Sequence, residues 1–309
     1  MFENNDGLVI LSRPEPQMCG GTYATQNTNA PTAIESQKIV YFDVKTALGG
    51  MVCVNPAMQQ PLRFNYVSAF AVPTADGGSF LCLHTRPVNA YNEPDRIAFA
   101  LIKEDVFPAL DRLVRAHELA KRNGSHSYTN GLPQNFGGNV DIEYESGEAI
   151  SFSNNQSPIL SPAAANEIAD FFEKALGGEK IPLPPIDALR EIRFCESREN
   201  GGFSRATLTL ESDGTGTNRK EQCFDPGQVY RSEKAVDEQT VTAIKRTVAN
   251  CGMFAWEKLP RSRCVIDGEK TITFVFDDSS EITVTNHKAL PVTLSGGFFG
   301  IELEMITKH

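Results

Sequence analysis

The sequence predicts an α+β fold made of two tandem, diverged copies of an antiparallel sheet-plus-helix unit, each with strands, a helix and a β-hairpin. Two observations lead to this prediction. Segments in which apolar and polar residues alternate, as in half-buried strands, are interspersed with segments whose apolar residues recur at helical spacing. The same order of strands, helix and hairpin then occurs twice within 309 residues, a length sufficient for two domains.

Two strands open each copy. The first strand runs into a double glycine in both copies and matches Phe42 with Phe194, at an offset of 152 residues. The second ends in an Asp-Gly turn and matches Gly77 with Gly214, at an offset of 137 residues. The change in offset falls around the Pro-containing segment 52–63, so we expect a loop insertion there in the first copy.

An amphipathic helix follows the strands in each copy. Its apolar residues recur three or four positions apart, which places them on one face of a helix. Asp105 and Asp237 precede these segments and are typical N-cap residues. The apolar stripes are Val106, Leu110, Leu113, Val114 and His117 in the first copy, and Val241, Ile244, Val248 and Cys251 in the second.

A β-hairpin completes each copy, over residues 139–155 and 271–286. In both, apolar residues alternate along two strands that meet at a short polar turn, Ser-Gly in the first copy and Asp-Asp-Ser-Ser in the second. Tyr144 then corresponds to Phe276, at an offset of 132 residues. We therefore expect one hairpin used twice.

The segment between the copies is rich in glycine and proline, which is typical of a domain boundary. The first copy reaches it through a helix over residues 162–176, capped by Ser161. The second copy ends differently, and residues 289–305 are predicted to form strands. The expected organisation is an N-terminal segment at 1–32, a first repeat at 33–176, a linker at 177–186 and a second repeat at 187–309.

Composition and charge limit the partners. Lys plus Arg is 29 and Asp plus Glu is 39, giving a net charge of −10, which disfavours a nucleic-acid partner. The N-terminal residues lack the pattern of a signal peptide, and no apolar run approaches the roughly 20 residues that span a bilayer, so no membrane association is expected. The seven widely spaced cysteines contain no Cys-x-x-Cys pair, which favours reduced thiols in a soluble, cytoplasmic protein.

A row of carboxylates is the sharpest candidate site. Asp141, Glu143 and Glu145 alternate along the first hairpin and therefore share one face of a strand. They could bind a divalent cation or a cationic ligand, or supply an acid–base pair. The competing interpretation is the solvated outer face of a half-buried hairpin. His126, in a polar segment expected to be a loop, is a further ligand-binding candidate.

The remaining chemistry-bearing residues give weaker signals. Cys82 and His84 share a strand face and could form a thiolate–imidazole pair, although a buried cysteine with a flanking histidine explains them more simply. No third ligand completes a metal site. Glycine pairs occur without the spacing of a nucleotide-binding loop, and no hydrolase, zinc-protease or EF-hand motif is present. The sequence therefore predicts neither a cofactor nor a bound metal.

Two functions compete. The duplication, together with the missing catalytic motifs, favours a soluble, non-catalytic binding or scaffolding protein whose partner is an unknown protein or small molecule. The alternative is an enzyme of unknown class that uses acid–base or metal-assisted chemistry near the first hairpin. That alternative requires Asp141, Glu143 and Glu145 to converge on a cavity with a histidine or a cation, and it fails if all three point into bulk solvent. An oligomer-forming role is a third possibility.

Overall fold

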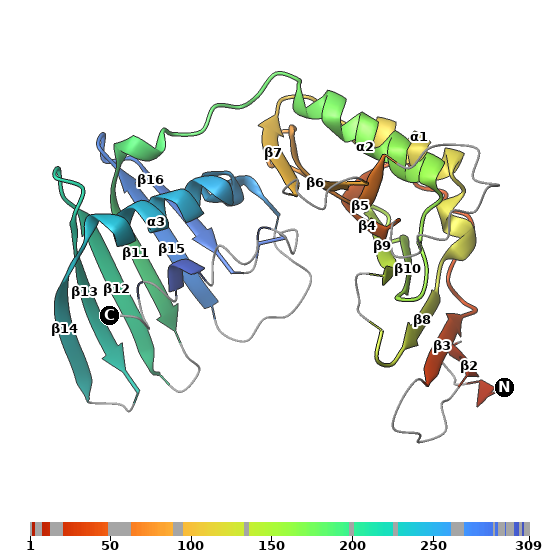
Figure 1. Cartoon of the computed structure of the whole chain (residues 1–309), viewed down its shortest axis with the longest axis horizontal. Helices are drawn as coiled ribbons and strands as arrows, with labels where there is room; N and C mark the ends of the chain where they lie inside the picture. Colours follow the sequence, from red (N-terminus) through yellow and green to blue (C-terminus); the bar gives the residue numbers. More distant parts are fainter. Residues whose placement is uncertain are drawn as a thin grey trace. The chain divides into compact units, whose positions relative to one another are not determined.

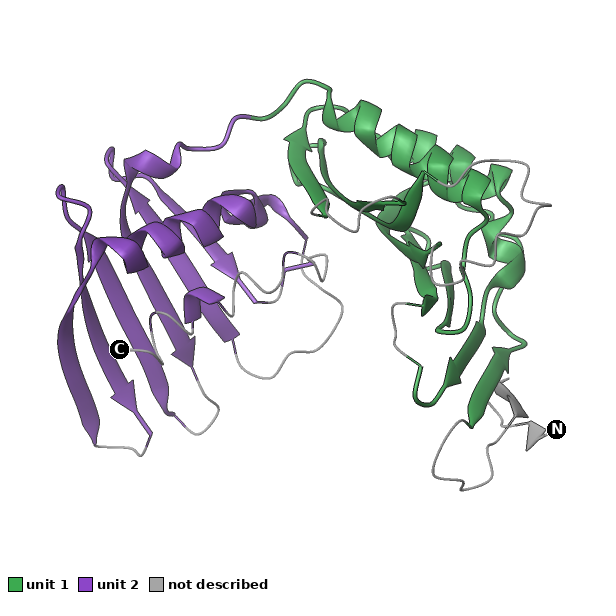
Figure 2. Cartoon of the chain, in the orientation of Figure 1, with its two compact units in different colours: residues 1–181 green, residues 182–309 purple. Residues whose placement is uncertain are grey.

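The chain forms two compact units, Met1–Ile181 and Pro182–His309, shown in green and purple in Figure 2. The computed structural model describes residues 2–3, 8–12, 21–48, 63–88, 95–132, 136–197, 201–224, 228–260, 269–286, 288–289, 294, 300–302 and 305. Each unit contains one β-sheet with helices packed on it, which confirms a mixed α/β, strand-rich fold. Among the described residues, no helix combines the length and the apolar character needed to cross a membrane.

The first unit is built on a ten-stranded sheet with the order β1-β2-β3-β8-β10-β9-β4-β5-β6-β7 (Figure 1). Neighbouring strands are antiparallel except for β8 and β10, which are parallel. The strands are β1 Phe2–Glu3, β2 Leu8–Ser12, β3 Thr22–Asn27, β4 Ile39–Ala47, β5 Phe64–Pro73, β6 Ser79–Pro87, β7 Arg96–Ile102, β8 Ser125–Thr129, β9 Gly138–Tyr144 and β10 Ala149–Asn154.

The helices of the first unit are α1 (Phe107–Ala116), the 3₁₀ helix η1 (Leu119–Arg122) and α2 (Pro162–Leu176). The Ser161 hydroxyl caps α2 as predicted, accepting from the N–H of Ala164 at 3.2 Å. In α1 the N-cap is Val106, one residue after the predicted Asp105, whose carboxylate still accepts from the N–H of Phe107.

The core of the first unit lies between these helices and one face of the sheet. α1 packs on β4, and α2 crosses β5, β6 and β7. Alternate residues of each strand point into this core, such as Phe42 and Val44 in β4. The Phe42 ring lies 5.9 Å from that of Phe172 in α2. Burying one such side chain stabilises the fold by roughly 1.5–3 kcal/mol.

The second unit has a six-stranded antiparallel sheet with the order β14-β13-β12-β11-β15-β16. Asp237 caps α3 as predicted, accepting from the N–H of Thr240 at 2.8 Å. Trp256 is fully buried and donates its indole N–H to the carbonyl of Cys251. The elements are η3 Ile186–Ala188, β11 Leu189–Ser197, β12 Phe203–Leu210, β13 Gly216–Cys223, β14 Val229–Val236, α3 Glu238–Asn250, η4 Met253–Lys258, β15 Glu269–Phe276 and β16 Glu281–Thr285.

The C-terminal residues correct one prediction. Strands were expected within residues 289–305, but the described residues Leu294, 300–302 and Met305 are helical. Leu294, Ile301 and Met305 are all buried. In the sequence these three residues are seven and four positions apart, which are helical spacings, and this apolar pattern is the physical reason for the difference from the predicted strands.

The segment between the units belongs partly to the first sheet. Gly177 ends α2, and the carbonyl of Glu179 then accepts from the N–H of Lys103 at 3.0 Å. The N–H of Ile181 donates to the carbonyl of Leu101 at 2.8 Å. Residues 179–181 therefore pair with the end of β7, and the division between the units follows at Pro182.

Candidate functional site

The candidate site lies on the face of the first sheet opposite the core, which no described helix covers and which we call the helix-free face. Directly paired residues of neighbouring strands share a face, so the strand registers define rows of side chains across it. One row consists of His126, Ser153, Asn139, Lys45, Ser68 and His84. The adjacent row consists of Ser151, Asp141, Asp43, Phe70 and Cys82.

Asp43 is a buried carboxylate at the centre of this face, only 6% exposed. Lys45 donates to its Oδ2 at 2.7 Å, whereas its Oδ1 is buried and has no hydrogen-bond partner among the described residues. Burial raises the pKa of Asp43, Lys45 partly offsets this, the charge of Asp141 raises it again, and a hydrogen bond from Tyr41 lowers it. Oδ1 is therefore an unsatisfied acceptor among the described residues.

Asp141 stands directly opposite Asp43, on the neighbouring strand β9. The amide of Asn139 donates to its Oδ2 at 2.6 Å, and the hydroxyl of Ser151 donates to its Oδ1 at 2.7 Å. Both oxygens of Asp141 are thus engaged, while only one oxygen of Asp43 is. Among the described residues, the two facing carboxylates share a single lysine on this part of the face.

His84, in β6, lies two strands away from Asp43 and contacts the carboxylate of Asp95. Its Nε2 lies 2.7 Å from Oδ2 of Asp95, and Arg86 donates two hydrogen bonds to the same carboxylate. The Arg86 guanidinium, with help from His84, lowers the pKa of Asp95 to about 2. Because the ionised Asp95 only accepts, Nε2 donates to it, which leaves Nδ1 as the second ring nitrogen of His84. This Nδ1 is buried without a partner among the described residues.

Cys82 shares the helix-free face with His84 but is no nucleophile. Burial, reinforced by the charge of Asp43, raises the pKa of its thiol to about 12, so the thiol stays protonated at neutral pH. The simpler interpretation of the Cys82–His84 pair, a buried cysteine with a flanking histidine, is therefore the better one. None of the described cysteines Cys82, Cys195, Cys223 and Cys251 forms a disulfide.

The predicted site residues do not converge on one point. Asp141 and Glu143 are half-buried on the helix-free face, whereas Glu145 is exposed at the turn, where Lys38 donates to it at 2.6 Å. His126 was expected in a loop, but it lies in β8, and its Nδ1 is 2.9 Å from the Ser153 hydroxyl. Within the described part of the chain, no group of three or more His, Cys, Asp or Glu side chains is arranged to hold a metal ion.

Sequence reasoning missed the residues that make this face unusual. Asp43 and Lys45 are two charges at alternate positions of a central, otherwise apolar strand, and that pattern could have singled them out. Asp95 precedes β7 and belongs to no motif or periodic pattern, so nothing in the sequence connects it to His84.

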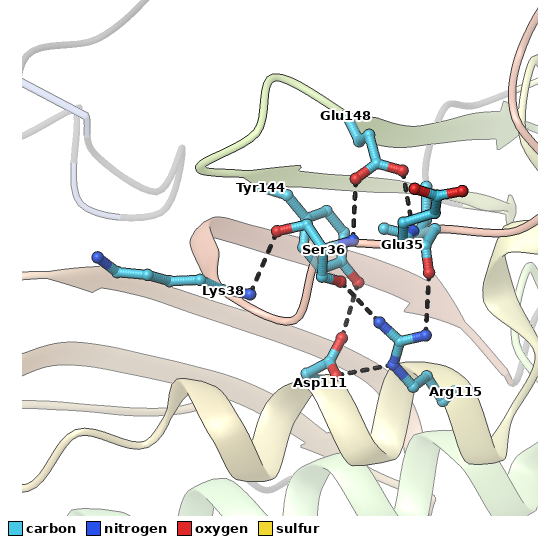
Figure 3. A network of polar contacts seen from close by, with 8 residues as sticks. Glu35, Ser36, Lys38, Asp111, Arg115, Tyr144 and Glu148 are labelled. Carbon is cyan, nitrogen blue, oxygen red and sulfur yellow. Dashed lines mark hydrogen bonds and ion pairs between the residues drawn. The ribbon is translucent and has the colours of Figure 1, made fainter.

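A second polar cluster, shown in Figure 3, binds residues 34–36 to the rest of the first unit. Arg115 donates to Asp111 at 2.8 Å and to the carbonyls of Ile34 and Ser36 at 3.0 and 2.6 Å. The Tyr144 hydroxyl donates to the other oxygen of Asp111 at 3.2 Å. The contacts join this segment to α1 and to the last residue of β9.

Glu148 completes this cluster, which we call the Asp111 clamp. It accepts from the N–H groups of Glu35 and Ser36 at 2.9 and 3.0 Å, and these bonds lower its pKa (Figure 3). A cavity of about 180 Å³ lies alongside, lined by Ile34, Val114, Arg115, Glu118, Tyr144 and Ile150, among others. Both carboxylates and the guanidinium already have partners, so the clamp is a structural element and a weaker candidate for ligand binding.

Comparison of the sequence with protein-family models and with curated proteins finds no match. The chemistry of the helix-free face therefore rests on its own residues, above all on Oδ1 of Asp43 and Nδ1 of His84, neither of which has a hydrogen-bond partner in the part of the chain that the structure describes.

Proposed function

We propose that the protein is a non-catalytic binding protein and that its helix-free face takes a small organic cation, with Asp43 as the counter-ion. One observation carries this proposal, the buried Oδ1 of Asp43 that has no partner among the described residues. A buried acceptor of this kind costs about 1–3 kcal/mol, and more when it is charged. A ligand that donates a hydrogen bond and a positive charge at this point recovers that cost.

The charges near Asp43 favour a cation. Asp43 and Asp141 are directly opposite each other, and like charges in this arrangement destabilise a sheet. Lys45 compensates only one of them. An ammonium or guanidinium group bound at Oδ1 of Asp43 would neutralise the second.

The surroundings favour an organic cation over a metal ion. Ca²⁺ takes six to eight oxygen ligands and Mg²⁺ takes six, whereas both oxygens of Asp141 already accept from Asn139 and Ser151. The rings of Tyr41 and Phe70 meet edge to face at 5.6 Å beside Asp43, and aromatic rings stabilise organic cations. The ligand class is therefore an amine, an ammonium or a guanidine.

Thermal unfolding with a panel of cations tests this proposal. We expect at least one of ethylammonium, putrescine, agmatine and choline to raise the Tm of the intact chain, by about 5–10 °C at 100 times its Kd. The effect should disappear in Asp43→Asn, which keeps the side-chain shape. Glu145→Gln, which removes an exposed carboxylate of the same hairpin, should retain it. No shift with any amine, or a shift that survives Asp43→Asn, contradicts the proposal, and a larger shift with Mg²⁺ or Ca²⁺ indicates a metal site instead.

An enzyme with acid–base chemistry is the second candidate, because His84 is oriented by Asp95 and keeps Nδ1 free. This version moves the proposed chemistry from the first hairpin to β6. A ligand found by the thermal assay should then be converted to product by the wild type, and His84→Gln should abolish conversion while binding persists. A ligand recovered chemically unchanged after prolonged incubation rules this alternative out.

We infer further that the two units arose by internal duplication. The strand order supports this inference: β7-β6-β5-β4-β9-β10 in the first sheet has the same order along the chain as β14-β13-β12-β11-β15-β16 in the second. In both units the fourth strand leads into a helix, then into a 3₁₀ helix, and the hairpin strands return beside the first strand. Strands β1, β2, β3 and β8 are then additions to the first copy.

The registers support the same inference in finer detail. A β-bulge follows Ile39, opposite Tyr144, and another follows Leu189, opposite Phe276. Tyr144 and Phe276 are 132 residues apart, which is the offset expected for the hairpins. Ile39 and Leu189 are 150 residues apart, whereas the sequence predicted an offset of 152 between β4 and β11. Phe42 then corresponds to Ile192, two residues from the match expected from the sequence.

Positive backbone φ angles recur at matched positions. Gly77 and Gly214 have φ of 86° and 87°, and Gly147 of the first hairpin corresponds to Ser279, with φ of 90° and 64°. Superposition of the two units in an experimental structure should pair these residues. A best superposition in another register contradicts the inference.

The duplication restricts the proposed site to the first unit. In the second, Asp43 corresponds to Arg193 and Asp141 to Thr273, by the registers given above. Arg193 is exposed and pairs with Glu281 at 2.9 Å. The equivalent face of the second sheet is therefore exposed to solvent and carries ion pairs, and we expect no cation to bind there.

A further inference from the structure

The edge strand β14 of the second sheet is exposed along most of its length. All its residues from Val229 to Ala235 are exposed, and Tyr230 is 57% exposed. β13 binds one side of β14, and no described segment binds the other. This edge therefore presents a row of backbone N–H and C=O groups that pair with no described residue, which is a template for another strand.

The matching edge of the first sheet is partly closed within the chain. There, residues 179–181 pair with the end of β7 through the hydrogen bonds to Leu101 and Lys103. No described segment does the same for β14, although it occupies the corresponding position in the strand order.

The charges on β14 are arranged in pairs with β13. On the sheet face opposite α3, Arg231 contacts Glu221 at 2.7 Å, and Glu233 contacts Arg219 at 2.9 Å. Charged side chains on an edge strand ordinarily prevent another strand from pairing with it, because pairing would remove them from solvent or place them beside a like charge. Here they alternate in sign along the strand, so a second strand of the same sequence can meet them with the opposite sign.

We propose that two copies of the chain associate through β14 in antiparallel pairing centred on Ser232. In this register Arg231 of each copy lies directly opposite Glu233 of the other. The row across the junction then reads Glu221, Arg231, followed by Glu233 and Arg219 of the second copy, with alternating sign throughout. The two-fold symmetry repeats this row, so the four charged side chains of each copy together form two continuous ladders of four charges.

Other registers lack this match. Residues that pair across the two copies of β14 point to the same face of the joined sheet. An alternative register must therefore also pair odd-numbered residues with odd-numbered ones. Centring on Arg231 or on Glu233 places that residue opposite its own copy, with like charges in contact. On the α3 side, centring on Ser232 also places the ring of Tyr230 opposite the ammonium of Lys234, a favourable cation–π pair.

Sedimentation equilibrium of the full chain over about 1–200 µM tests the proposal. We expect the wild type to show a monomer–dimer equilibrium, and R231E and E233R each to weaken it by about tenfold or more, because two attractive pairs become repulsive. An equimolar mixture of R231E and E233R should form a heterodimer, and the double variant R231E/E233R should recover the homodimer. R193E, which removes an ion pair on the same face in β11, should dimerise like the wild type.

Circular dichroism shows whether each variant is folded, and rescue by mixing separates the effect from misfolding. A monomeric wild type at about 200 µM overturns the proposal. Persistent dimers of R231E, failure of the mixture to associate, or loss of the dimer in R193E overturn it as well, because each means that some other surface forms the contact.

Discussion

Replacing Asp111 with alanine is the most direct test of how the first unit is held together. Asp111 is 5% exposed and accepts from Arg115 and from the Tyr144 hydroxyl. Loss of a hydrogen bond to a charged group costs about 1.5–3 kcal/mol, and the bond from the Tyr144 hydroxyl, at 3.2 Å, is at the weak end of this range. Arg115 is 42% exposed and keeps its bonds to two carbonyls, so solvent reduces the cost of losing its bond to Asp111. We therefore expect Asp111→Ala to lower the free energy of unfolding by about 2–3 kcal/mol.

Urea denaturation of the intact chain, followed by circular dichroism, measures this change. Arg112→Ala is the matched control, because Arg112 is exposed on the same helix and should change stability by less than about 0.5 kcal/mol. The double variant Asp111→Ala/Arg115→Ala should be less destabilised than the sum of the single variants, with a coupling of about 1 kcal/mol. A loss below about 0.5 kcal/mol for Asp111→Ala, or strict additivity, would refute the clamp.

Three further predictions concern the described residues. Asp95→Asn should lower the free energy of unfolding above pH 4, and this loss should shrink as the pH falls towards 2. The reason is that Arg86 lowers the pKa of Asp95 in the folded protein to about 2, so protonation removes the stabilisation that the carboxylate gives. Urea denaturation from pH 2.5 to 7 measures the loss, and a loss that is constant with pH contradicts the prediction. Iodoacetamide at pH 8, followed by peptide mass spectrometry, should modify half-exposed Cys195 well before buried Cys82, and equal rates would argue against the burial of Cys82. Gly147→Ala should cost about 1 kcal/mol and Ser279→Gly should gain about 0.5 kcal/mol, because both positions have positive φ; thermal unfolding that ranks the two variants the other way disproves this.

Local chemistry explains which elements the sequence could predict. The caps Ser161 and Asp237 act through bonds to residues three positions away, and the apolar stripes of α1 and α3 repeat within a few turns. Such signals are complete within a short segment. The helical state of Leu294, residues 300–302 and Met305 was missed because glycines and β-branched residues, which disfavour a helix, surround the few apolar residues that carry the helical period in this part of the sequence.

Long-range pairing was beyond this kind of reasoning. β8 lies between β3 and β10 and pairs with β10 in parallel, and no feature of residues 125–129 specifies either neighbour. The same limit applies to the site. Alternation along the strands predicts that Asp43 and Asp141 face away from the core. It does not predict that the two residues lie directly opposite each other or that Asp43 is buried. Both depend on the register between two strands that are about 100 residues apart in the chain.

The pairing of residues 179–181 with β7 affects any attempt to separate the two units. A chain ended at Leu176, where α2 stops, would lose the carbonyl of Glu179 and the N–H of Ile181 that meet this strand. The isolated fragment would then expose the end of β7 that residues 179–181 pair with and would be prone to self-association through that edge. A cut after Ile181 preserves the contact, so expression of residues 1–181 is the appropriate way to study the first unit alone.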